Sequence, residues 1–205
     1  PMPRTWVIED SAPNAFATGR DPKHSHVVVT RGLLDKLEPI ELEGVLAHEL
    51  SHIGNYDIRV MTLAVVLAGR IALVSDFFLR WSFMGTGSRK SSKDKGGGGL
   101  AIVIILLAVL AAILAPIIAQ AIKFAVSRQR EYLADASGAL LTRHPEALAR
   151  ALEKIALDPE PLEAANKATA HLYISNPLKG HTSFLNNLFS THPPAEERIR
   201  ILRSM

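Results

Sequence analysis

Apolar residues recur at intervals of three and four positions between residues 39 and 54, which predicts an amphipathic helix. Two short runs before it, residues 5–8 and 26–30, are rich in β-branched residues and predict strands, with turn formers between them. The helical pattern returns near the C-terminus, where it predicts helices over residues 130–141, 145–156, 161–172 and 195–203. The chain is therefore expected to be mainly α with a small β-sheet.

Two long apolar stretches separate these regions. Residues 100–122 carry no charge and would extend about 34 Å as a helix, enough to cross the hydrocarbon layer of a membrane. Residues 60–79 contain Arg70 and Asp76, so this stretch predicts a second span only if the charges pair or face protein. For either stretch the alternative is a helix buried in a soluble core.

A basic, glycine-rich linker, GTGSRKSSKDKGGGG, joins the two apolar stretches and predicts a helical hairpin in the membrane. A hairpin returns the chain to the side it left, so the segments before and after it should lie on one side. We therefore predict a first half-domain over 1–59, a membrane hairpin over 60–123 and a second half-domain over 124–205. Lys and Arg flank both ends of the hairpin, so charge alone does not decide its orientation.

The composition narrows the possible classes of partner and metal site. The 205 residues carry a net charge of +3, and the basic residues are mostly scattered, which argues against nucleic-acid binding. The chain has no cysteine, so a disulfide framework and a thiolate metal site are both excluded. Any zinc must then be held by histidine and carboxylate.

The segment HELSH, residues 48–52, carries the clearest chemistry. His48 and His52 lie four residues apart on the predicted helix, so their rings project side by side and can bind two corners of a tetrahedral zinc site. Glu49 can reach a water beside the metal and act as general base. The alternative is a polar stripe on a helix. Asn55 and Asp57, which follow the motif, are expected to end the helix rather than take part in the chemistry.

A catalytic zinc site needs a third protein ligand. The segment SRQREYLADASGALL offers Glu131 and Asp135, one turn apart on a predicted helix. Glu131 could bind the metal, while Asp135 could accept a hydrogen bond from the ring N–H of a ligand histidine. The alternative for this pair is a solvated helix face.

The combination of HELSHIGNYD, a hydrophobic hairpin, SRQREYLADASGALL and NAFATG resembles the HtpX-type membrane metalloproteases, relatives of the CAAX prenyl proteases. The resemblance covers nearly the whole chain. It implies a zincin-like metalloprotease domain interrupted by a transmembrane hairpin, and one Zn²⁺ held by His48, His52 and Glu131. Glu49 would be the base and Asp135 would support a ligand. It also implies two further spans before Pro1 and a bacterial inner membrane, with the active site facing the cytoplasm.

Two other segments match the pattern of this family. In NAFATG, Asn14 resembles a residue that binds the substrate main chain beside an edge strand, here expected to be residues 26–30. In STHPPAEERIR, His192 resembles the residue that steadies the oxyanion, and Arg198 resembles a basic residue that supports the site and the substrate. From spacing alone, His192 could equally be a turn residue, and Asn14 a cap or turn residue.

The resemblance implies an endopeptidase that hydrolyses peptide bonds of misfolded or damaged membrane proteins, in quality control. Its partners would be polypeptide substrates and the lipid bilayer, without nucleic acid. Two alternatives remain open: a processing protease for lipidated C-terminal peptides, and a non-catalytic membrane scaffold with a structural zinc.

Overall fold

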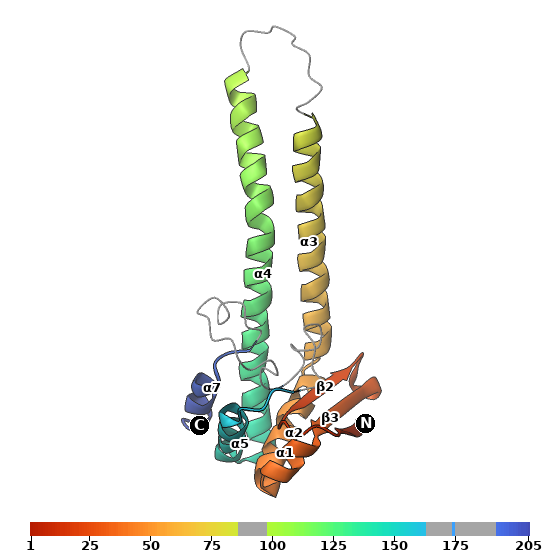
Figure 1. Cartoon of the computed structure of the whole chain (residues 1–205), viewed down its shortest axis with the longest axis vertical. Coiled ribbons are helices and arrows are strands. Elements are labelled where there is room, and N and C mark those ends of the chain that lie inside the picture. The colour runs from red at the N-terminus through yellow and green to blue at the C-terminus, as the bar shows by residue number, and fades with distance from the viewer. Residues whose placement is uncertain (86–97, 163–173, 175–191) are drawn as a thin grey trace. The chain divides into compact units, whose positions relative to one another are not determined.

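The computed structural model describes residues 1–85, 98–162, 174 and 192–205 (Figure 1). Its contacts divide the chain into two compact units, residues 1–61 with 124–205 and residues 62–123, which are taken separately below. The elements are β1 Arg4–Ile8, β2 Ala15–Gly19, a 3-10 turn Pro22–His24, β3 Ser25–Thr30, α1 Arg31–Lys36, α2 Pro39–Gly54, α3 Asp57–Gly85, α4 Gly98–Thr142, α5 Pro145–Leu157 and α7 Ala195–Leu202.

The three strands form one sheet in the order β1-β3-β2, with β1 parallel and β2 antiparallel to β3. This corrects the prediction for residues 26–30, because β3 is the central strand and not an edge. The near-continuous run of buried side chains along β3 is typical of a strand paired on both sides. β2 was not predicted, since Ala15–Gly19 lies among turn formers and has few β-branched residues.

One side of β2 is turned away from β3. Thr30 N–H donates to the Asn14 carbonyl at 3.0 Å, and in an antiparallel ladder such pairs alternate along the strand. The main-chain groups of Ala15 and Ala17 therefore point outward from the sheet. Ile174 N–H donates to the Ala15 carbonyl there, at 2.9 Å. The outer side of β2 is therefore the sheet edge that contacts Glu49 of α2, through the N–H of Ala17.

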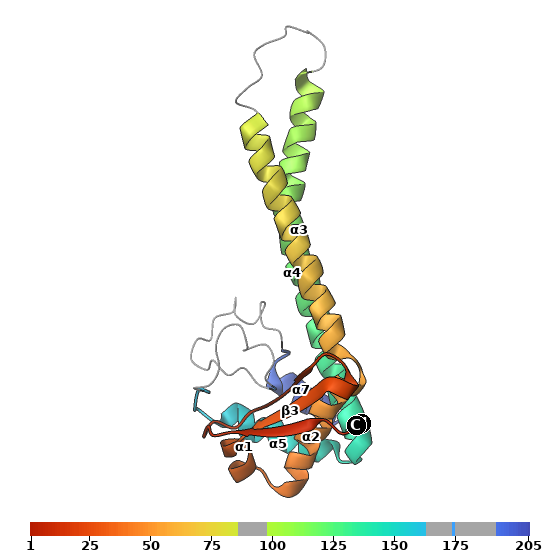
Figure 2. The ribbon, with the colours of Figure 1, turned by 90° about the vertical axis from the view of Figure 1, so that its right-hand side faces the viewer.

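Helix α2 lies between the sheet and α5, and α7 packs on α5 (Figure 1), while Figure 2 shows the strands in front of these helices. Pro39 occupies the first turn of α2, and Glu38 and Glu41 form a capping box there, which explains where the helix begins. Its apolar face packs into a core shared with the neighbouring helices. The fully buried large side chains of this core are Leu33, Val45, Leu148, Ile155 and Leu202.

Helix α4 is one uninterrupted helix from Gly98 to Thr142. It contains both the apolar run of residues 100–122 and the predicted helix of residues 130–141, because no glycine or proline separates them. The second apolar stretch is also helical, within α3, where Arg80 donates to Asp76 at 2.7 Å. The charge at Asp76 is thus paired one turn along its own helix.

Two helical segments, Asp57–Arg80 and Val109–Thr142, are long and apolar enough to cross a membrane. In their most apolar windows, 11% and 6% of the residues are buried, unlike the core helix of a soluble protein. The prediction of membrane-spanning length is therefore confirmed for both stretches. The linker between them and most of the predicted helix over 161–172 lie outside the described residues.

Candidate metal centre

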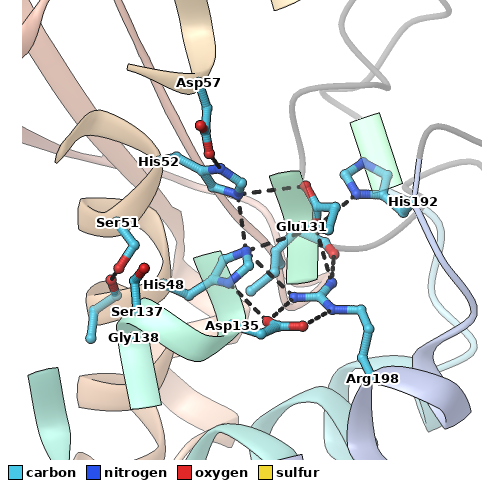
Figure 3. A network of polar contacts seen from close by, with 12 residues as sticks. His48, Ser51, His52, Asp57, Glu131, Asp135, Ser137, Gly138, His192 and Arg198 are labelled. Atoms are coloured by element: carbon cyan, nitrogen blue, oxygen red, sulfur yellow. Dashed lines mark hydrogen bonds and ion pairs between the residues drawn. The ribbon is translucent and has the colours of Figure 1, made fainter. Parts of the chain in front are cut away.

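Helix α2 places His48 and His52 on one face, one turn apart. Their rings meet edge to face with centroids 4.6 Å apart, and the two Nε2 atoms are 3.1 Å apart. His48 is fully buried, and the side chain of His52 is 16% exposed. Both ring nitrogens that could bind a metal therefore converge on one point at the edge of the protein interior (Figure 3).

Glu131 reaches the same point from α4. Its Oε1 lies 3.5 Å from His52 Nε2, and its Oε2 lies 3.9 Å from His48 Nε2. In a tetrahedral zinc site with ordinary bond lengths, neighbouring ligand atoms are about 3.3 Å apart. The two Nε2 atoms and the nearest oxygens of the Glu131 carboxylate are 3.1–3.9 Å apart, and one ligand atom from each residue lies within 4.8 Å of the others, so the residues could hold a zinc ion. They are also the ligand types that zinc takes in catalytic sites.

Each imidazole turns its other nitrogen toward a carboxylate. His48 Nδ1 lies 3.0 Å from Asp135 Oδ1, and His52 Nδ1 lies 2.7 Å from Asp57 Oδ2. A ring whose Nδ1–H donates in this way keeps the Nε2 lone pair for a metal. Burial lowers the pKa of His48 to about 4, with nearby positive charge acting in the same direction, so this ring is neutral at pH 7.

Glu49 lies beside the triad but is not one of its members. It is 1% exposed, and the main-chain N–H of Ala17 on the outer side of β2 donates to its carboxylate. Burial raises the pKa of Glu49 to about 7, and the charge of Glu131 adds to the rise. A bound cation would pull this pKa down again. A carboxylate that titrates near neutral pH is suited to accept a proton from water and return it.

Arg198 of α7 is the cation of the site. It is buried and donates twice to Asp135, at 2.8 and 2.6 Å, while its Nη1 lies 3.3 Å from Glu131 Oε2. Burial lowers the pKa of Arg198, but the charge and hydrogen bonds of Asp135 together with the charges of Glu131 and Glu49 outweigh burial and raise it. Arg198 therefore stays charged and holds Asp135 under His48. Arg198 thus pairs with both Asp135 and Glu131.

The other two residues predicted from the motifs lie at different distances from the triad. His192 precedes α7, and its Nδ1 lies 3.2 Å from Glu131 Oε2, which places its ring at the centre (Figure 3). Asn14 is buried at the start of β2, where its main-chain N–H donates to Thr30 Oγ1 at 2.9 Å and its Oδ1 accepts from the N–H of Ala15. Asn14 is thus placed at the outer side of β2.

This chain matches the family model described as "Peptidase family M48" over residues 1–205. The chain belongs to peptidase family M48. M48 relatives named "Protease HtpX homolog" from Dictyoglomus thermophilum and Syntrophobacter fumaroxidans are 54% and 52% identical to it, over all of the chain and 64% and 71% of their own lengths. The chain therefore spans less than two thirds of the length of the first of these relatives.

A solved M48-like structure, the crystal structure of S. mikatae Ste24p, matches with a TM-score of 0.60 and 25% identity. The match covers 98% of this chain and 46% of Ste24p. The similarity to HtpX-type proteases inferred from the motifs is thus confirmed. Together with the two long apolar helices, the HtpX homologues indicate a membrane protein, and the triad could hold a metal ion.

Sequence reasoning missed two residues of this M48 centre. Asp57 was expected only to end α2, but it is the first residue of α3 and contacts His52. Arg130 was not singled out, yet it forms an ion pair with Asp57. The signal that could have found Asp57 is its position five residues after His52, just past a turn. The expectation for Asn55 is confirmed, because α2 ends at the preceding residue.

Gly138 lets α4 approach α2 at the metal centre. A Cβ atom at this position would meet the main-chain N of His48 at 3.0 Å and its Cα at 3.2 Å. Substituting Gly138→Ala should therefore push the two helices apart and lower the free energy of unfolding by about 1–2 kcal/mol, despite the better helix propensity of alanine. Thermal unfolding of the metal-free protein in detergent measures this.

The matched control for Gly138 is Gly54, at the end of α2, where a Cβ would meet nothing within 4 Å. Gly54→Ala should leave the stability unchanged or slightly higher. Equal effects of the two substitutions would contradict the proposed close packing between α2 and α4.

Proposed function

We propose that this chain forms the catalytic part of a zinc endopeptidase embedded in the bacterial inner membrane, with one Zn²⁺ held by His48, His52 and Glu131. The observation that carries the proposal is the convergence of these three residues, which offer ligand atoms within 4.8 Å of one another, with Glu49 next to His48 in the chain and outside the triad. Three protein ligands leave one position open, as catalytic zinc sites require. A structural zinc would be closed by a fourth side chain, whereas the group of described residues that could hold a metal has three members, which favours the enzyme over a non-catalytic scaffold.

When bound, zinc would polarise the scissile carbonyl and make water more acidic. Glu49 accepts the proton of the attacking water and passes it to the leaving amine. The buried position of Glu49 supports both steps, since its pKa lies close to neutral pH. His192, which reaches Glu131 from the start of α7, would donate a hydrogen bond to the oxyanion. Asp135 and Arg198 would keep His48 in place.

The substrate would bind as an extended peptide along the outer side of β2. The Ala17 carbonyl points outward there, and the Ala17 N–H donates to Glu49, so a peptide paired to this edge would replace the Ile174 N–H at the Ala15 carbonyl and pass the base. Asn14, at the start of the same strand, would bind the peptide main chain. Arg198 would support the substrate from the other side of the triad. This assigns the role first expected for residues 26–30 to β2.

The proposed physiological substrates are misfolded or damaged membrane proteins, cut on the cytoplasmic side. The proposed catalytic domain consists of two half-domains, residues 1–59 and 124–205, which a membrane hairpin over residues 60–123 connects in the chain. The names of the relatives, "Protease HtpX homolog", support proteolysis. Processing of lipidated C-terminal peptides is the enzymatic alternative.

A chelator should abolish proteolysis by the protein in detergent, and stoichiometric Zn²⁺ should restore it, because His48, His52 and Glu131 hold the proposed ion. The assay should follow cleavage of an unfolded membrane protein in parallel with a prenylated peptide. Faster cleavage of the unfolded protein supports quality control, and faster cleavage of the prenylated peptide supports the alternative. Activity that survives complete removal of metal would contradict the proposal.

A further inference from the structure

Asp57 occupies an unexpected place under the second histidine. It is the first residue of α3 and is 3% exposed, and its Oδ2 accepts a hydrogen bond from His52 Nδ1 at 2.7 Å. The preceding residue, Tyr56, has a φ of 57°, in the left-handed region that β-carbon-bearing residues seldom adopt. This turn folds the chain back at the end of α2, so that Asp57 comes to lie beside a ring five positions earlier.

Arg130 holds Asp57 from the other side. Its Nη2 forms an ion pair with Asp57 Oδ1 and donates to the Asn55 carbonyl at 2.6 Å. The two oxygens of Asp57 are thus divided between a histidine and an arginine. Asn55 is the residue that ends α2, so the same guanidinium ties the end of α2 to α4.

The arrangement repeats the one around the first histidine. Arg198 holds Asp135, and Asp135 faces His48 Nδ1 at 3.0 Å, all three side chains being almost completely buried. Arg130, Asp57 and His52 form a second arginine–aspartate–histidine chain, built from α4, α3 and α2. In both chains an arginine pairs with an aspartate, which faces the histidine Nδ1 and leaves Nε2 for a cation.

Arg130 also directly precedes Glu131 in α4. Because Arg130 is fixed to Asp57 and to the Asn55 carbonyl, the turn of α4 that carries Glu131 is held against the end of α2. Asp57 is therefore linked to two members of the triad. Its carboxylate contacts His52 directly, and it forms an ion pair with Arg130, the neighbour of Glu131. A change at Asp57 should disturb both ligands.

We propose that Asp57 is the positioning residue of His52, and that Arg130 positions Asp57, so that this pair sets the affinity and geometry of the metal site. The proposal rests on the proposed zinc site, but it concerns residues that neither bind the metal nor touch the substrate. Asparagine at position 57 keeps the shape of the side chain and removes the charge that Arg130 binds. It also offers His52 an amide that can present N–H instead of oxygen.

The test measures zinc binding directly, by competition with a chromogenic chelator, in the protein in detergent. Asp57→Asn should raise the Kd for Zn²⁺ about 10–100-fold, the usual cost of losing the outer partner of a metal-binding histidine. It should also change the visible absorption of the Co²⁺-loaded protein, which reports ligand geometry. Arg130→Gln should raise the Kd in the same direction, and the double variant should add little to Asp57→Asn.

Asp158→Asn is the matched control. Asp158 pairs with Lys36 at 2.7 Å and its side chain is 11% exposed, so this substitution also removes an ion-paired aspartate. It should leave both the Kd and the Co²⁺ spectrum unchanged. Asp57→Glu, which retains the charge, should recover part of the affinity lost in Asp57→Asn. A general structural defect would weaken zinc binding in both Asp57→Asn and Asp57→Glu, whereas loss of the charge would weaken it in Asp57→Asn alone.

A Kd within about twofold of the parent in folded Asp57→Asn, with an unchanged Co²⁺ spectrum, would overturn the proposal, since loss of a true orienting partner costs far more. If Asp57→Asn fails to fold, Arg130→Gln decides by the same criterion. Failure of the proposed function itself is distinguishable, because the parent protein would then bind no Zn²⁺ at the triad.

Discussion

Glu49→Gln should abolish hydrolysis of peptide bonds while the protein still binds zinc as tightly as the parent. The amide has the shape of the carboxylate and can still accept the N–H of Ala17, but it cannot take a proton from water. Loss of a general base typically lowers kcat by about 10²–10⁴-fold. Steady-state cleavage of an unfolded membrane protein, together with zinc content of the purified variant, measures both parts of the prediction.

Glu43→Gln is the control for this substitution. Glu43 lies on the same helix, α2, but its side chain is exposed to solvent. Its replacement removes one carboxylate of α2 without touching the triad, and it should leave kcat unchanged. If Glu49→Gln cleaves at the parental rate, Glu49 is not the base, and a different proton acceptor must be sought at the metal centre.

Glu131→Gln should cost the protein its zinc. The neutral amide oxygen is a much weaker ligand than a carboxylate, and the two histidines alone cannot complete a catalytic site. Loss of a residue that only hydrogen-bonds to a metal ligand weakens metal binding about 10–100-fold. Loss of the ligand Glu131 itself should therefore raise the Kd for Zn²⁺ by more than about 100-fold. Competition with a chelator measures the Kd, and proteolysis should fall in proportion to the zinc that is lost.

Glu153→Gln is the control, because it also removes a carboxylate that is paired with an arginine. Glu153 pairs with Arg203 at 2.9 Å on the surface of α5. It should leave the Kd unchanged. The prediction would be contradicted if Glu131→Gln bound Zn²⁺ with the Kd of the parent while His192→Ala lost its zinc. That result would make His192 the third ligand, in place of the neighbour it contacts at 3.2 Å.

The arrangement of the strands shows why some of the fold escaped prediction. Residues 26–30 were recognised as a strand because β-branched residues follow one another there. Their position in the centre of the sheet depends on β1 and β2, which pair with them from opposite sides. β2 consists of Ala15–Gly19, whose own propensity for a strand is weak, so its pairing with β3 decides its conformation.

The metal centre divides in a similar way. His48, Glu49 and His52 follow from a spacing of one helical turn, and Glu131 with Asp135 follows from the same rule on α4. Asp57 was taken for a helix end, because nothing in its neighbours shows that the turn at Tyr56 brings it back under His52. Arg130 gains its role only through that turn and through the packing of α4 on α2.

The sequence alone determined the features that repeat over one turn of helix or one apolar run: the helix with both histidines, the acidic pair of α4 and the two lengths of membrane-spanning helix. Local geometry is enough for these, since neighbouring side chains on a helix have nearly constant spacing. Only the tertiary structure decided which strand is the edge, how α4 meets α2 at Gly138, and which carboxylate supports each histidine. These depend on contacts between segments far apart in the chain, where packing and charge pairing, rather than periodicity, select the partner.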